Sequence, residues 1–199
     1  MADMLRHTLF SVWRLVAGVA LSMAAGTAVG VWIGYCGTPR KILSPLIYAL
    51  APVPKIALLP LVMLLFGIGE WAKIFIIFMV MVFQVILAVA GAVLRIPEEY
   101  YIPLRAVRAA PAFIIRKVVL PACLPELFTA LRVGLATGIS VLFFSETFGT
   151  RWGLGFYIMD RWMRLDYRHM ALGIAMMALL GWGAATLSEF AEKRICKWK

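Results

Sequence analysis

Five long apolar runs restrict the folds that this chain can adopt. They are Leu15–Pro39, Ile42–Gly69, Ile74–Leu94, Leu127–Ser145 and Met170–Ser188, and their only charged residues are Lys55 and Arg132. A helix rises about 1.5 Å per residue, so about 20 apolar residues cross the hydrocarbon core of a bilayer. Only helices and closed barrels satisfy the backbone in lipid, and these runs are too long for barrel strands.

The sequence therefore predicts an all-α, polytopic membrane protein with one transmembrane domain over residues 1–199. The composition agrees, because 63% of the residues are hydrophobic and 15% are charged, against about 45–50% and 25% in soluble domains. The net charge of +10 could indicate nucleic acid, but the basic residues lie at the margins of the apolar runs, as membrane topology requires, so no nucleic-acid partner is expected. The expected spans are about 10–34, 42–66, 72–94, 124–147 and 168–190.

The distribution of Lys and Arg predicts the orientation in the membrane. Five spans place the two termini on opposite sides. One side holds 11 basic residues, in the turn after the first span, in segment 95–121 (the elbow) and in the C-terminal tail with Lys193, Arg194, Lys197 and Lys199; the other side holds 6. The positive-inside rule therefore predicts a cytoplasmic elbow and a cytoplasmic C-terminus.

Small residues and prolines mark the first two spans. Gly26, Gly30 and Gly34 recur at four-residue spacing in the first, which predicts close packing against another helix. The second contains four prolines, at positions 45, 52, 54 and 60, and each interior proline removes a backbone hydrogen bond and kinks the helix. Lys55 lies near the middle of this span, so we expect it to border a cavity or pathway; the alternative is that it snorkels to the headgroups.

The elbow contains the polar stretch "PLRAVRAAPAFIIRKVVLPACLP", residues 103–125. An apolar stripe recurs at spacings of three and four: Leu104, Val107, Pro111, Ile114, Ile115 and Val118. The basic residues lie mainly off it: Arg105, Arg108, Arg116 and Lys117. We expect one or two short surface helices, interrupted at Pro111 and closed by Pro121 and Pro125, with the apolar side toward the bundle. Periodicity alone fits equally well an interfacial helix held by lipid headgroups.

Polar residues inside the spans are candidates for a translocation pathway. The candidates are Pro54, Lys55, Pro60, Gln84, Arg132, Thr137 and Glu146. Arg132 is expected to pair with an acid or to face the pathway, because an unpaired charge in lipid is costly. Glu146 fits an outer gate or an interfacial cap, and Gln84 and Thr137 fit either substrate contact or bonds to a neighbouring helix.

No cofactor or metal is expected. Cys36, Cys123 and Cys196 share no metal-ligand spacing, and His7 and His169 have no Glu or Cys at helical spacing. A membrane-embedded enzyme is a remote alternative, because no histidine partner for Ser140 or Ser145 and no Gly-x-Ser-x-Gly motif is evident.

Three motifs, in order, resemble one known family. "PVPKIALLPLVMLLFGIGEWAKI" (52–74) is similar to its second core helix and following turn, "RKVVLPACLPELFTALRVG" (116–134) to the second half of its cytoplasmic signature, and "SETFGTRWGLGFYI" (145–158) to an acidic residue and Gly-Leu-Gly turn. The family is the permease subunit of binding-protein-dependent ABC importers, in the branch for nitrate, sulfonate, taurine and bicarbonate. The resemblance runs from about residue 9 to the C-terminus and implies a type I importer fold.

The resemblance implies that the elbow is a coupling loop which docks on a cytoplasmic ATP-binding subunit. Its coupling residues would be Leu104, Arg105, Val107, Arg108, Ala109, Arg116, Leu120 and Pro121. The chain would sit in the inner membrane of a bacterium or archaeon and form, with a second copy or a paralogue, an alternating-access pathway for a small anionic solute. A periplasmic or lipid-anchored binding protein would deliver the solute, and the remaining partner is membrane lipid.

The chain departs from the family pattern at the elbow. Counting back from Leu120 and Pro121, the family's Glu-Ala-Ala falls on Ile102, Pro103 and Leu104, and its glycine falls on Arg108. An arginine there implies either a different fit or a compensating acid on the partner, and leaves open a homologue with weakened coupling that acts as a passive or assembly component. One N-terminal span of the usual pattern also has no counterpart, so either five spans suffice or the start is assigned late.

Overall fold

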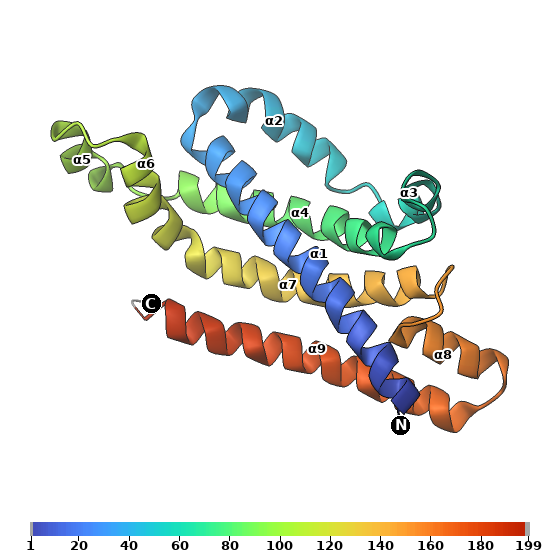
Figure 1. Cartoon of the computed structure of the whole chain (residues 1–199). Helices are drawn as coiled ribbons and strands as arrows, with labels where there is room; N and C mark the ends of the chain where they lie inside the picture. The colour runs from blue at the N-terminus through green and yellow to red at the C-terminus, as the bar shows by residue number, and fades with distance from the viewer. Residues whose placement is uncertain (1, 198–199) are drawn as a thin grey trace.

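The computed structural model describes residues 2–197, and all regular structure within that range is helical (Figure 1). The long helices are α1 (Ala2–Tyr35), α4 (Glu70–Leu94), α7 (Leu120–Glu146) and α9 (Tyr167–Ile195). Shorter elements connect them: α2 (Gly37–Leu50), η1 (Lys55–Leu58), α3 (Leu59–Phe66), η2 (Glu98–Tyr100), α5 (Ile102–Ala106), α6 (Pro111–Ile114), η3 (Ile115–Val119) and α8 (Leu154–Met163). Lys199, counted above in the basic tail, lies outside the described residues.

Four helices are long and apolar enough to cross a membrane: Asp3–Tyr35, Glu70–Leu94, Pro111–Glu146 and Tyr167–Ile195. The expected second span is broken, because α2 and the η1–α3 segment meet at an angle of 84°. The all-α membrane architecture is therefore confirmed, with five spans only if the bent pair is counted as one. The prolines explain the break, since the chain between Leu50 and Lys55 reads Ala-Pro-Val-Pro and cannot continue a regular helix.

Helix α4 occupies the centre of the bundle, between α1 and α7, while α9 packs on α7 and α8 at the periphery (Figure 1). Ile76, Ile77 and Met81 of α4 are completely buried among side chains of α1, α3 and α7. Further along α4, Val85 and Val89 are equally buried. This burial on several sides explains why α4 is apolar all round rather than on one stripe.

The glycine ridge of α1 lies directly against α4, which confirms the predicted close packing. A Cβ added to Gly26 would lie 2.7 Å from Val85 Cβ, and one added to Gly30 would lie 2.8 Å from Val89 Cβ. The pairs 18–77, 26–85, 30–89 and 34–93 keep a constant offset. The two helices therefore run parallel and stay in contact along most of their length, as small residues permit in lipid.

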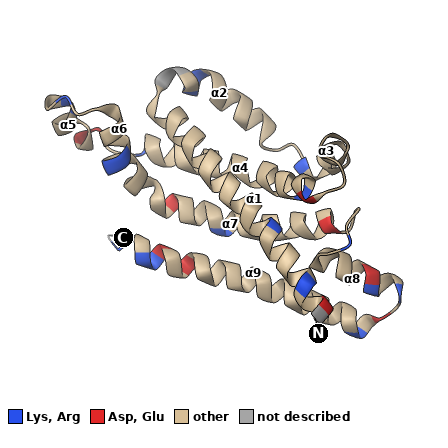
Figure 2. Ribbon diagram, viewed as in Figure 1, with Lys and Arg blue, Asp and Glu red and all other residues tan. Residues whose placement is uncertain are grey.

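The two ends of the bundle differ in what they hold (Figure 1). The N-terminus, α3 and α8 lie toward one end, and the elbow and the C-terminus lie toward the other. Charged residues gather near these ends and are sparse in the middle (Figure 2). This arrangement agrees with the predicted placement of the elbow and the C-terminal tail on one side of the membrane.

The expectation that Pro121 and Pro125 end the elbow before the next span is wrong. Residues Pro111–Glu146 form one continuous helix of 36 residues. A π-helical turn, Ile115–Val119, precedes Pro121, which lies at the first turn of α7. Bonds between residues five apart shift the backbone register, so the helix passes the ring of Pro121 without stopping.

At the opposite end, a tight turn joins α8 to α9. Leu165 has a positive φ of 58°, and the Asp166 carboxylate accepts a hydrogen bond from the His169 backbone N–H, which caps α9. The His169 ring nitrogen Nδ1 lies 2.7 Å from Asp166 Oδ2. These hydrogen bonds from His169 hold the pKa of the Asp166 carboxyl below its ordinary value.

Candidate functional site

The elbow folds into a short helix, a sharp turn and a second helical segment. Helix α5 ends at Ala106, and Arg108 adopts the left-handed conformation with φ 52°. The Arg108 N–H donates to the Arg105 carbonyl at 3.0 Å, and the Ala109 N–H donates to the Leu104 carbonyl at 2.9 Å. These two bonds form a Schellman motif, in which the left-handed position is usually glycine. The turn therefore gives a local reason for the glycine that the resemblance implies at the position of Arg108.

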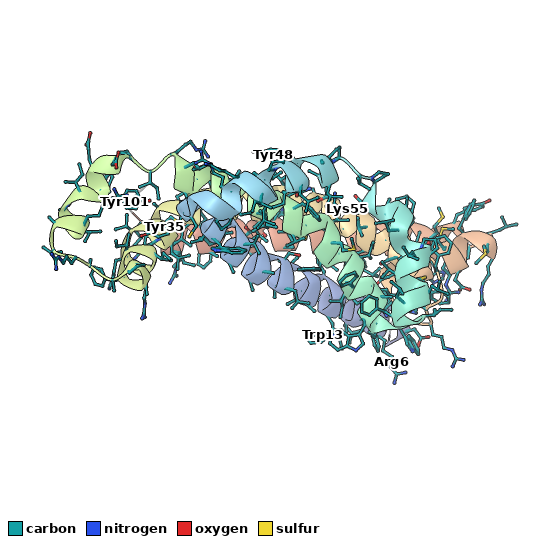
Figure 3. The ribbon with its side chains drawn as sticks, turned by 90° about the horizontal axis from the view of Figure 1, so that it is seen from above. Arg6, Trp13, Tyr35, Tyr48, Lys55 and Tyr101 are labelled. Carbon is teal, nitrogen blue, oxygen red and sulfur yellow. The ribbon has the colours of Figure 1, made fainter. Side chains whose placement is uncertain are left out.

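One side of the elbow packs on the bundle. Ile114 and Val119 are buried, and Leu104 and Ala109 pack against the same cluster, beside the ends of α1 and α4. Tyr101 lies next to Tyr35 of α1 (Figure 3), with ring centroids 6.4 Å apart. Burial raises the pKa of the Tyr101 phenol. The elbow is thus attached firmly to the helices that it follows.

The other side exposes apolar side chains that sequence periodicity placed differently. Val107 is 74% exposed, and Ile102 and Phe113 are also exposed. Val107 and Pro111 were expected on the stripe facing the bundle, and this expectation is wrong. The reason is the left-handed turn at Arg108, which breaks the helical periodicity between the two halves of the elbow.

The cations of the elbow fall into two groups. The Arg105 guanidinium forms an ion pair with Glu98 at 3.2 Å and lies over the Tyr101 ring. Part of its positive charge is therefore compensated within the elbow. Arg108, Arg116 and Lys117 are exposed and form no ion pair with any residue between 2 and 197. Leu120 is 37% exposed and Pro121 is half-buried. All eight predicted coupling residues lie within the elbow, from α5 to the first turn of α7.

Arg132 pairs with an acid, which is one of its two expected roles. Its guanidinium bonds the Glu192 carboxylate of α9 and donates to the Thr129 hydroxyl at 3.3 Å. The pair joins α7 to α9 across a groove of about 580 Å³, which Glu189, Lys193 and Lys197 also line. Pairing lowers the cost of holding a guanidinium within a membrane-spanning helix.

Gln84 and Thr137, predicted independently, lie side by side. The Gln84 amide nitrogen donates to the Thr137 hydroxyl at 3.5 Å between α4 and α7. The Gln84 carbonyl oxygen Oε1 is buried without a hydrogen-bond partner in the described chain. Gln84 also lines a groove of about 520 Å³ together with Thr129, Ala130 and Val133.

Helix α7 presents an outward stripe unlike that of a lipid-facing helix. The exposed residues, called the α7 stripe, are Thr129, Val133, Ala136, Ser140 and Phe144. Helix α9 exposes a series of large apolar residues, Leu172, Leu179, Trp182, Leu187 and Phe190, together with smaller ones such as Ala171, Ala175 and Ala178. Small and hydroxyl-bearing side chains favour contact with another helix or with a water-filled path over contact with lipid.

Lys55 lies at the break in the second span, next to the end of α2 (Figure 3). Its ammonium donates to the carbonyl oxygens of Leu50, Ala51 and Val53 at 3.0, 2.7 and 3.2 Å. It also lies 4.6 Å from the centroid of the Phe83 ring. A cation at the end of α2 satisfies carbonyls that have no partner in the helix. This capping role is a third one, beside the two that the sequence suggested. Pro54 directly precedes η1, and Pro60 lies in the first turn of α3.

Removing this cap should loosen the bent pair. We expect Lys55→Met to lower the free energy of unfolding by about 2 kcal/mol, because buried carbonyls lose their donor. Thermal unfolding of the full chain in detergent measures the effect. Lys41→Met, which removes an exposed lysine of α2, is the matched control and should leave the melting temperature unchanged. Equal melting temperatures for the two variants would contradict the capping role.

Glu146 is not exposed at all and belongs to a polar cluster formed by His7, Ser11, Arg14, Glu70 and Glu146, in which only the Glu70 side chain is partly exposed. Arg14 bonds both carboxylate oxygens of Glu70 at 2.6 Å and Glu146 Oε1 at 2.7 Å. The cluster therefore joins α1, α4 and α7 at the end of the bundle opposite the elbow. Bidentate pairing of this kind fixes orientation as well as charge.

The same cluster holds the start of α8. The N–H groups of Gly153, Leu154 and Gly155 donate to His7 Nδ1, Ser11 Oγ and Glu146 Oε2 at 3.0, 2.8 and 2.9 Å. Gly153 has φ 142°, and a Cβ there would lie 2.4 Å from the Glu146 carboxyl carbon. The Gly-Leu-Gly sequence is thus required by the close approach of this carboxylate to a helix N-terminus.

Sequence reasoning missed His7, Ser11, Arg14 and Glu70 as a group. A usable signal was present, since Arg14, Glu70 and Glu146 all fall near the outer ends of expected spans. Opposite charges at equal depth in neighbouring helices indicate pairing. The sequence alone did not show that α1 lies beside both α4 and α7, and so the pairing could not be assigned.

These features define a polytopic membrane protein with an exposed, basic elbow at one end and exposed hydroxyl groups along one spanning helix. The family model described as "Binding-protein-dependent transport system inner membrane component" matches residues 22–197. The chain belongs to this family, the permease subunits of ABC importers, as its sequence motifs predicted. Such a subunit is a non-enzymatic, multi-pass membrane component of an importer that also contains an ATP-binding subunit and a substrate-binding protein.

Curated relatives cover nearly the whole chain. It is 30% identical to the taurine transport system permease protein TauC of Escherichia coli (strain K12), over 99% of this chain and 72% of that protein. It is 28% identical to the nitrate import permease protein NrtB of Leptolyngbya laminosa, over 93% of this chain and 66% of that protein. A chain of the MetNI methionine ABC transporter, solved in an inward-facing conformation, has the same fold, with a TM-score of 0.76 at 22% identity over 99% of this chain and 96% of that one.

Proposed function

We propose that this chain forms half of a translocation pathway for a small anionic solute, of the taurine, sulfonate or nitrate kind, and that the elbow couples it to an ATP-binding subunit. The second half is another copy or a paralogue. The elbow and the C-terminus face the cytoplasm, and the polar cluster faces the side from which a binding protein delivers the solute. Transport proceeds by alternating access, in which ATP binding favours one of two states.

The exposed surface of the elbow carries this proposal. Val107, Ile102 and Phe113 expose apolar area at one end of a membrane protein, where the chain's own core does not cover them. Unpaired cations surround this apolar area. An apolar centre with a polar rim is the usual anatomy of a protein interface. Membership of the importer permease family supports the ATP-binding subunit as the partner of this surface.

The α7 stripe supports the pathway part of the proposal. Its exposed hydroxyls, with Gln84 and Thr137 beside them, supply polar groups along a spanning helix without adding a net charge. Arg132 supplies a cation whose charge Glu192 balances. A site of this kind binds an anion weakly enough to release it, as transport requires. The names of the taurine and nitrate relatives support an anionic solute.

The decisive variant is Val107→Asp. A carboxylate placed on an exposed apolar centre should abolish association with the ATP-binding subunit, because an unpaired charge cannot be buried there. Association of the purified subunits in nanodiscs and solute-dependent ATP hydrolysis measure this effect. Both should fall to background, while the melting temperature of the permease stays unchanged, since Val107 is 74% exposed.

Leu165→Asp is the matched control, because Leu165 is 69% exposed at the opposite end of the bundle. We expect no change in association for this variant. Labelling of a cysteine placed at Val107 by a membrane-impermeant reagent tests the orientation, and should occur only in inside-out vesicles. Labelling from the outside, or normal association of Val107→Asp, would remove the coupling role and favour a passive or assembly component.

A further inference from the structure

Arg108 has an unfavourable backbone conformation for an arginine. Between residues 2 and 197, only Arg108 and Leu165 have a positive φ without being glycine, at 52° and 58°. For L-residues this conformation brings Cβ too close to the following carbonyl oxygen. Arg108 occupies the position in the Schellman motif where glycine relieves this clash. An uncharged glycine would therefore make the elbow itself more stable.

No contact within the described chain offsets this unfavourable conformation. The Arg108 side chain is exposed and forms no side-chain hydrogen bond, ion pair or ring contact with a described residue. Neighbouring Arg105, by contrast, bonds Glu98 and lies over Tyr101. Strained backbone that the rest of a protein does not require is found preferentially at functional sites. The charge at position 108 is thus directed outward, beside the most exposed apolar side chain of the elbow, Val107.

We propose that Arg108 determines which ATP-binding subunit this permease accepts, by pairing with a carboxylate of that subunit next to the pocket that receives Val107. The proposal rests on the coupling role proposed above and names the chemistry of the partner. A guanidinium suits a carboxylate because it can form two parallel hydrogen bonds. Arg116 and Lys117 carry further unpaired positive charge on the same elbow, which favours encounter with an acidic surface.

The variant Arg108→Gly separates strain from recognition, because it should change two measurements in opposite directions. Relief of the left-handed strain should raise the melting temperature of the full-length permease by about 2 to 4 °C. Loss of the guanidinium should weaken binding of the ATP-binding subunit at least about tenfold. Thermal unfolding in detergent gives the first value, and biolayer interferometry on nanodisc-embedded permease gives the second.

Leu165→Gly is the matched control, since Leu165 has nearly the same φ and belongs to the turn between α8 and α9, which lies at the end of the bundle opposite the elbow (Figure 1). It should raise the melting temperature similarly and leave binding of the ATP-binding subunit unchanged. Arg108→Lys keeps one charge without the planar fork, and should bind between the wild type and Arg108→Gly. Binding of Arg108→Gly that equals or exceeds that of the wild type would overturn the proposal.

A charge exchange identifies the partner carboxylate. Arg108→Glu should abolish stimulated ATP hydrolysis, and one Asp→Lys or Glu→Lys change around the docking pocket of the ATP-binding subunit should restore it. If no such change restores hydrolysis while Val107→Asp still abolishes association, the proposal for Arg108 fails and the coupling role stands. If Val107→Asp also leaves association intact, the coupling role itself fails.

Discussion

Arg14→Met should destabilise this permease more than any other single substitution considered. It leaves the carboxylates of Glu70 and Glu146 without their shared cation, and Glu146 is completely buried. Breaking a buried ion pair by removing one partner costs about 3–5 kcal/mol, because an uncompensated charge remains. Thermal unfolding of the full chain in detergent should show a melting temperature lower by about 10 °C. The start of α8, which Glu146 holds, should become accessible to protease.

The matched control removes an arginine that is exposed rather than buried. Arg151→Met removes an exposed arginine from the loop next to the polar cluster, and should leave the melting temperature unchanged. The triple variant Arg14→Met, Glu70→Gln, Glu146→Gln removes all three charges together and should recover part of the loss, since neither carboxylate is left unpaired and the buried ammonium of Lys73 keeps its hydrogen bond to the Gly69 carbonyl. An equally small effect for Arg14→Met and Arg151→Met would show that the cluster does not hold the bundle together.

Gly30→Leu should separate α1 from α4. The first added carbon alone would lie 2.8 Å from Val89 Cβ and 3.0 Å from the Ile86 carbonyl oxygen. Backbone cannot yield as a flexible side chain does, so the helices must move apart along a tightly packed contact. Overpacking costs about 1–3 kcal/mol in soluble cores, and we expect a loss of about 3 kcal/mol here. Denaturation in detergent, monitored by the loss of cross-links between α1 and α4, measures this loss of stability.

Gly183→Leu in α9 provides the matched control, because nothing lies within 4 Å of a Cβ at that glycine. It should leave the free energy of unfolding unchanged. Combining Gly30→Ala with Val89→Ala should recover stability relative to Gly30→Ala alone, since the second change removes the side chain that the new methyl meets. If Gly30→Leu and Gly183→Leu unfold at the same temperature, α1 and α4 are not packed as described.

The sequence predicted those features that depend on local periodicity. Apolar runs of sufficient length identified the spanning helices, the spacing of Gly26, Gly30 and Gly34 identified a packing face, and prolines identified the broken second span. Each of these is a property of one element in lipid. The pairing of Arg132 with an acid was also accessible, because a charge at that depth requires a partner.

Features that depend on which helices are neighbours were not accessible in the same way. The sequence shows Arg14 only as a charge near the end of an expected span, and it is the packing of α1 on both α4 and α7 that brings it to Glu70 and Glu146. Lys55 was expected to border a pathway. Its capping role could not be predicted, because the break that brings three carbonyl oxygens to its ammonium depends on an 84° bend. Val107 was placed on the buried stripe because periodicity does not reveal a left-handed turn.

The unbroken helix from Pro111 to Glu146 has a mechanical consequence. With 36 residues it is about 54 Å long, more than the thickness of the hydrocarbon layer. Its N-terminal end belongs to the elbow. Its C-terminal end carries Glu146, whose carboxylate belongs to the polar cluster at the opposite end of the bundle. A displacement of the elbow therefore has a direct helical connection to the polar cluster, through the π-helical turn Ile115–Val119 and without any loop.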